Sequence, residues 1–170
     1  MYRNFISIVI LIIMIPGNAR AQATISAQVF AEIIEALTAN ETEQLNFGRF
    51  SPETNGGNII ISPNGTRSAQ GSVILASGLH SPGRFSVTGV PNAAFIIQLP
   101  GSPAMLLHQG SNKTMLVEGW VSDPPAGSEG NLQPNGSQLI SIGATLTVGP
   151  VEQNPVGLYA GTFQLTFAYN

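Results

Sequence analysis

Short apolar runs separated by turn-forming residues fill the sequence from Asn40 onward, and this pattern constrains the fold more than any other feature. Segments such as Pro63-Asn64-Gly65, Ser81-Pro82-Gly83 and Pro134-Asn135-Gly136 combine a residue that fixes a turn with one that tolerates positive φ. No convincing amphipathic helix separates the runs, so they predict antiparallel sheets and not parallel βαβ units. We predict an all-β fold, either a sandwich or a barrel.

The expected strands follow from the apolar runs and the turns that bound them. After Asn40 they are Leu45–Phe50, Asn58–Ser62, Ser72–Ala76, Arg84–Thr88, Ala94–Leu99, Met105–His108, Met115–Ser122, Leu139–Val148 and Leu158–Tyr169. Asn55-Gly56-Gly57 is read as one of the turns. No repeat of fixed period divides the chain, so we expect residues 22–170 to form a single domain.

The first residues have the features of a secretory signal peptide. Arg3 supplies a positive charge, Phe5–Ile15 is an apolar run, and Ala19-Arg20-Ala21 matches the small-x-small pattern of a cleavage site. We predict that residues 1–21 are removed. The apolar run is shorter than the roughly 20 residues that span a bilayer, so we expect no stable membrane span afterwards. The mature chain is expected to be secreted, through the periplasm to the cell surface or the medium.

Cleavage after residue 21 would remove Arg3 and Arg20, two of the six basic residues, and leave all nine acidic ones. The mature net charge would then be four minus nine, or −5. An acidic chain without a basic cluster argues against nucleic acid and anionic membranes as partners. The sequence has no cysteine, so an exported domain would depend on packing alone for its stability.

The residue patterns of catalytic and metal sites are missing from the sequence. It has no cysteine, only His80 and His108 as imidazoles, Asp123 as its one aspartate, and no G-x-S-x-G motif. The glycines do not follow phosphate-binding patterns, and no ligand spacing predicts a metal. We therefore expect no enzymatic activity, no catalytic residue, no metal and no cofactor.

Trp120 is the one weak candidate for ligand binding. It lies beside Glu118 in a predicted strand, where an aromatic ring and a carboxylate together could hold a sugar. A tryptophan in a β-strand is also a common core residue. Both interpretations remain open, and the first makes a monomeric carbohydrate- or ligand-binding module the alternative function.

Both ends of the mature chain alternate strongly between apolar and other residues. At the N-terminal end the apolar positions are Ile25, Ala27, Val29, Ala31 and Ile33, with Phe30 the one large residue out of phase. This period of two predicts a strand over residues 24–34, and a helix over Ala27–Leu37 is the competing interpretation. At the C-terminal end the apolar positions are Phe163, Leu165, Phe167 and Tyr169. Such a strand must be paired and covered, or it becomes an association site.

Several segments resemble a known family in their order and spacing. Upstream they are Leu45-Asn46-Phe47-Gly48, Ile61-Ser62-Pro63-Asn64-Gly65 and Phe85-Ser86-Val87-Thr88-Gly89, and at the end Ile142–Gly149, Asn154–Phe163 and Phe167–Asn170. Together they are similar to the bacterial family catalogued as domain of unknown function 4402. This resemblance implies secretion and an immunoglobulin-like antiparallel β-sandwich.

The tail is also similar to chaperone-usher pilin subunits, in a set of positions formed by Gly157, Phe163, Leu165, Phe167 and Tyr169. It departs from many such pilins because the chain has no disulfide. This second resemblance implies a periplasmic chaperone as a partner and self-assembly by strand addition. Residues 24–34 would then be an exchangeable donor strand, although they could equally be the first strand of their own domain. The leading hypothesis is a non-catalytic structural or adhesive subunit of a bacterial surface or fimbrial assembly.

Overall fold

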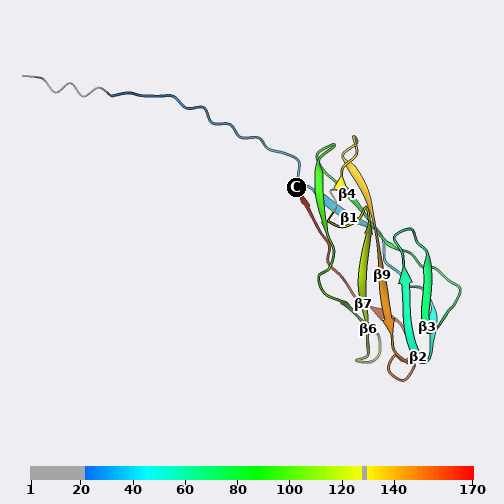
Figure 1. Ribbon diagram of the computed structural model, residues 1–170. Coiled ribbons are helices and arrows are strands. Elements are labelled where there is room, and N and C mark those ends of the chain that lie inside the picture. Colours follow the sequence, from blue (N-terminus) through cyan, green and yellow to red (C-terminus); the bar gives the residue numbers. More distant parts are fainter. Residues whose placement is uncertain (1–21, 128–129) are drawn as a thin grey trace, which may run out of the picture. The chain divides into compact units, whose positions relative to one another are not determined.

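The computed structural model describes residues 22–127 and 130–170 of the chain (Figure 1). The predicted signal peptide lies outside the described residues. All regular structure within those ranges is β-strand, and every strand pair is antiparallel, which confirms the predicted all-β class. Over the same ranges there is no helix with the length and apolarity needed to cross a membrane.

The strands have the following bounds. They are β1 (Thr38–Glu43), β2 (Phe50–Ile61), β3 (Arg67–Leu75), β4 (Gly83–Thr88), β5 (Ala94–Gln98), β6 (Ala104–His108), β7 (Thr114–Asp123), β8 (Gly130–Asn131), β9 (Ser137–Val148), β10 (Tyr159–Ala160) and β11 (Thr166–Tyr169).

The strands form a large and a small sheet. The large sheet has the order β1-β4-β9-β7-β6-β10, with β2 paired to both β9 and β3. The small sheet has the order β11-β5-β8. β9 connects the parts of the large sheet, because one of its edges pairs with β4 and then β2 while the other pairs with β7 (Figure 1).

The core consists of two groups of buried side chains. One comprises Phe47, Ile59, Ile61, Val73, Met115, Val117, Ala144, Leu146 and Val148, and the other Val87, Phe95, Ile97, Leu132, Ile140 and Ile142. The second group joins the small sheet to β4 and to the first half of β9. Over the first group, the large sheet is covered by the irregular segment that contains Phe47 and by Tyr159 of the edge strand β10, and not by a second paired sheet.

The predicted strand over residues 24–34 does not form, and neither does the helix that competes with it. The described segment from residue 22 to residue 33 is a unit of its own, with no regular structure and with exposed side chains. Ile33, for example, is 99% exposed. Residues 24–34 form no strand because alternation specifies only a buried and a solvent face, whereas a strand also needs a partner for its backbone groups.

Three further expectations were wrong in their details. Most of Leu45–Phe50 is irregular, with only an isolated bridge from Asn46 to Ser81. Leu158–Tyr169 is divided into β10 and β11, which belong to different sheets. The expected turn at Asn55-Gly56-Gly57 is instead an irregularity within β2, where the register shifts between Pro52 and Gly57.

Tyr169 joins the end of the chain to the start of the folded domain. Its hydroxyl accepts a hydrogen bond from the Val90 N–H at 2.8 Å and donates one to the Glu35 carbonyl at 3.0 Å. Gly89 makes room for this hydroxyl, because a Cβ at that position would lie 2.2 Å from the Tyr169 oxygen. The contact fixes residue 35 beside the C-terminal end of β11.

We expect Tyr169→Phe to lower the free energy of unfolding by about 1–3 kcal/mol, because it leaves the Val90 N–H without its acceptor and removes a second hydrogen bond. Urea denaturation followed by circular dichroism measures the change. A midpoint equal to that of the unaltered chain would contradict this role for the hydroxyl.

Candidate assembly groove

An apolar groove with a volume of about 870 Å³ crosses the part of the large sheet that has no second sheet over it. One wall is residues 44–52, and the other is residues 155–163. The floor is formed by side chains of β6, β7 and β9, namely Ala104, Leu106, Met115, Val117, Trp120 and Leu146. We call this feature the assembly groove, and it is large enough for an extended peptide.

The second wall carries the free edge of β10 and leads into β11. β10 pairs only with β6, and β11 only with β5, so each is an edge strand of its sheet. Residues 161–165 between them belong to no strand. On the side that faces away from β6 and β5, no described strand pairs with β10 or β11. An edge of this kind is a template for another strand.

The first wall is held in place by Arg67 of β3. Its guanidinium donates hydrogen bonds to the carbonyls of Phe47 at 3.1 Å, Arg49 at 3.4 Å and Ala76 at 2.7 Å. Gly48 has a φ of +73°, and a Cβ there would lie 2.4 Å from an Arg67 nitrogen. The Arg67 side chain therefore fixes the backbone of this wall, and Gly48 leaves the space that this side chain needs.

The loop that leads into the second wall is held by Asn154, which is buried. Its side-chain oxygen accepts from the Gly149 N–H at 2.6 Å, and its amide donates to the Thr114 carbonyl at 2.9 Å. These bonds connect the loop to the end of β9 and the start of β7. They set the position at which residues 155–163 pass over the sheet.

His108 and Tyr159 continue this wall. The rings lie 4.9 Å apart, the Tyr159 hydroxyl donates to the Pro155 carbonyl at 2.9 Å, and a His108 ring nitrogen lies 3.2 Å from the Val156 carbonyl. Burial raises the pKa of the Tyr159 phenol, and a smaller opposing effect comes from Asn154. A Cβ at Gly157 would lie 2.1 Å from the His108 ring, so only glycine fits there.

The structure distributes the predicted C-terminal site residues between the groove and the small sheet. Gly157 and Phe163 line the groove. Leu165, Phe167 and Tyr169 pack against the second core group, where Phe167 contacts Phe95 edge to face. Sequence reasoning missed the opposite wall, because Leu45, Phe47 and Arg49 look like part of an ordinary strand.

The predicted N-terminal site residues are exposed in the segment from residue 22 to residue 33. Ile25, Ala27, Val29, Ala31 and Ile33 make up the apolar phase of this segment, which we call the arm. Exposed fractions of 91% for Ile25 and Val29 leave nearly all of their apolar surface in water. The arm therefore has unburied apolar area with the period of a strand.

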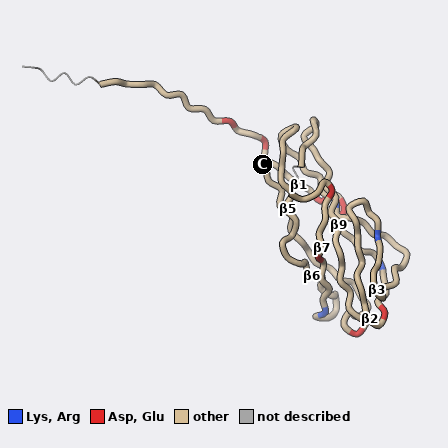
Figure 2. The backbone as a smooth tube through the Cα atoms, viewed as in Figure 1, with Lys and Arg blue, Asp and Glu red and all other residues tan. Residues whose placement is uncertain are grey.

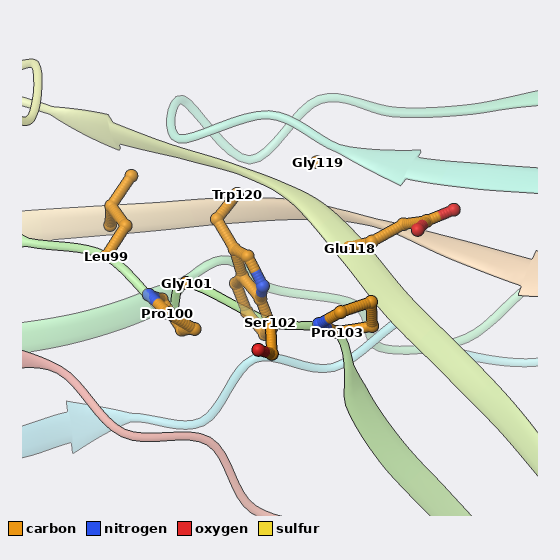
Figure 3. Close-up of a pocket in the computed structure, with 8 residues that line it drawn as sticks. All are labelled: Leu99, Pro100, Gly101, Ser102, Pro103, Glu118, Gly119 and Trp120. Carbon is orange, nitrogen blue, oxygen red and sulfur yellow. The ribbon is translucent and has the colours of Figure 1, made fainter.

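Trp120 lies where the two core groups meet and packs against both. Its ring is 4.7 Å from that of Phe163, which also lines the groove. On its other side it lines a shallow hollow of about 330 Å³ with Leu99, Pro103 and Glu118 (Figure 3). Trp120 is thus part of the core, and its stacking on a sugar stays a prediction.

Charge contributes little to the groove. Charged residues are sparse along the described chain (Figure 2), and those that line the groove are Glu41 and Arg49. The ion pair between Arg84 and Glu43 joins β4 to β1. Residues 22–127 and 130–170 contain no group of three or more side chains that could hold a metal ion. The groove is suited to an extended segment whose inward-facing side chains are apolar and uncharged.

Residues 37–169 match the family model described as "Domain of unknown function (DUF4402)". The match begins just before β1 and ends in β11, so it covers both walls of the groove but not the arm. A search of curated proteins found no match.

We expect Asn154→Ala to lower the free energy of unfolding by about 1–3 kcal/mol, because it removes the partner of a buried backbone N–H. Gln153→Ala, at the exposed neighbouring position, should change it by less than about 0.5 kcal/mol. Equal midpoints of urea denaturation for the two variants would show that Asn154 does not anchor the wall.

Proposed function

The chain belongs to the DUF4402 family, and from that premise we propose that it is a non-catalytic structural subunit that joins copies of itself by β-strand addition. In this proposal the arm of one copy lies in the assembly groove of the next and pairs with the free edge of its residues 157–165, which include β10. The assembly is the bacterial surface or fimbrial structure expected from the sequence.

The observation that carries this proposal is the coincidence of an unpaired strand edge with an apolar groove. Main-chain hydrogen bonds along the edge would give affinity, and the groove would receive alternate side chains of the added strand. The groove floor includes Leu106, Met115 and Val117, which offer an apolar surface for those side chains.

The arm has the properties of a matching occupant. Residues 25–33 would span about 30 Å when extended, and the groove wall formed by residues 155–163 has the same number of residues. Apart from Phe30, its apolar positions fall on one face of an extended chain. Burial of Ile25, Val29 and Ile33 would contribute about 1.5–3 kcal/mol each, which offsets part of the entropy cost of ordering the arm.

We further propose that the domain is an immunoglobulin-like sandwich of the pilin type, which an added strand completes. The small sheet covers the second core group, and the first core group has only the groove walls over it. An added strand along residues 157–165 would pair with β10 at the edge of the large sheet and lie over this uncovered part. A periplasmic chaperone that protects the groove before assembly fits the same proposal.

The proposal predicts that the mature chain, residues 22–170, associates in a concentration-dependent way and that a chain beginning at Glu35 does not. Glu35 is retained because its carbonyl contacts Tyr169. Sedimentation velocity measures the association, and circular dichroism checks that both chains fold. If the shortened chain associates as the mature chain does, the arm is not the connecting element.

A pair of matched substitutions tests the phase of the arm. Val29→Asp places a charge on the apolar face, and we expect it to weaken association by at least about 100-fold, because a carboxylate would enter an apolar groove. Gln28→Asp adds the same charge on the other face and should leave association within about 3-fold. Equal effects of the two substitutions would argue against an extended arm in the groove.

A further inference from the structure

The outer face of the large sheet carries an apolar patch beside the assembly groove. It consists of Met105 and Leu107 on β6 and Leu116 on β7, which are 58%, 53% and 44% exposed. Met105 and Leu116 are directly opposite each other in the antiparallel ladder, so their side chains are neighbours on one face. The patch is therefore contiguous and not a set of scattered apolar residues.

This patch reaches the free edge through a single small residue. Leu107 pairs with Ala160 of β10, and β10 has no described strand on its other side. In a strand added at that edge, the outward side chain opposite Ala160 would be separated from Leu107 of β6 only by β10. A methyl group is too small to separate a large side chain on the added strand from Leu107.

The inward side chains of the two strands indicate how the arm would align. Along residues 157–163, which include β10, Gly157, Tyr159, Gly161 and Phe163 alternate small and large, and along the arm Ala27, Val29, Ala31 and Ile33 alternate small and large. If the two sets of four residues overlap fully and each large residue lies opposite a small one, a single antiparallel register results. It places Val29 opposite Gly161, with Ala31 opposite Tyr159 and Ala27 opposite Phe163. Antiparallel pairing is the mode of every described strand pair.

The same register places the outward residues of the arm. Gln28 falls opposite Thr162 and Ser26 opposite Gln164, so these two polar residues meet polar residues, whereas Glu32 falls opposite Leu158. Phe30, the one large residue out of phase with the alternation, falls opposite Ala160. Phe30 is 86% exposed in the structure. Its position in the arm is thus the one that meets the apolar patch.

We propose that Phe30 of one copy docks on the outer patch of the next, across Ala160 and against Leu107 and Met105, while Val29 and its phase fill the groove. This inference rests on the proposed strand addition and adds a contact on the opposite face of the same strand. The arm then holds the edge strand from both sides. The contact explains why a phenylalanine interrupts an otherwise regular alternation.

The test measures association constants of the mature chain, residues 22–170, by sedimentation. We expect Phe30→Ser and Leu107→Ser each to weaken association about 10-fold, because each removes one partner of a partly buried apolar contact. The double variant should also be weaker by only about 10-fold to 20-fold, because the two substitutions remove the same contact. Ile74→Ser, at an exposed position on β3, serves as the matched control and should have no effect.

The outcomes separate this inference from the proposed function. If Phe30→Ser associates as the unaltered chain does while Val29→Asp does not, the outer contact is wrong and strand addition stands. Fully multiplicative effects of Phe30→Ser and Leu107→Ser, near 100-fold in the double variant, would also overturn the contact. If the mature chain does not associate, or if Val29→Asp leaves association unchanged, the proposed function itself fails.

Discussion

The unpaired edges of β10 and β11, at the C-terminal end of the chain, are the constraint on which the groove depends. Antiparallel pairing with β6 and β5 satisfies one side of residues 159–160 and 166–169, and no described strand pairs with the other side. Backbone N–H and C=O groups next to an apolar surface are costly when they are shielded from water without a partner. The fold therefore keeps this edge open to solvent, and the groove is the result.

An open groove must also resist collapse, since its walls would bury apolar area by closing on each other. Here each wall is fixed to the sheet by one polar side chain, Arg67 on one side and Asn154 on the other. Both side chains bond to backbone groups, which specifies main-chain positions and not only side-chain contacts. In a chain without cysteine, such bonds do the positioning that a disulfide could do elsewhere.

The sequence predicted the strands whose two faces differ in burial and whose ends are marked by turn residues. β4, β5 and β6 lie close to their expected ranges because alternation and flanking turns agree with the tertiary pairing. β1 was missed because Thr38–Glu43 is polar and exposed, and it forms a strand only by pairing with β4. Residues 24–34 have a better pattern than β1 and form no strand. The alternation of apolar and polar residues indicates the two faces of a possible strand, whereas backbone pairing with a neighbour determines whether the strand forms.

The assembly groove could not be located from the sequence, because its lining comes from segments that are far apart in the chain. Leu45, Met115 and Phe163 meet only after β9 has brought the two halves of the large sheet together. The terminal residues were identifiable because their alternation is local. Sequence reasoning therefore found the two strands that would pair and missed the cavity that would receive one of them.

The direction of pairing gives a reason to assign the arm to a neighbouring copy. Tyr169 holds residue 35 beside the C-terminal end of the last strand. If the arm folded back along its own domain, its N-terminal end would lie near Gly157 and its C-terminal end near Tyr169. The arm would then run parallel to the segment from Gly157 to Tyr169. A parallel ladder is slightly less stable per residue, and it would be the one exception among the described pairs. A second copy can present its arm antiparallel, so the position of the Tyr169 contact itself favours assembly between chains over closure within one.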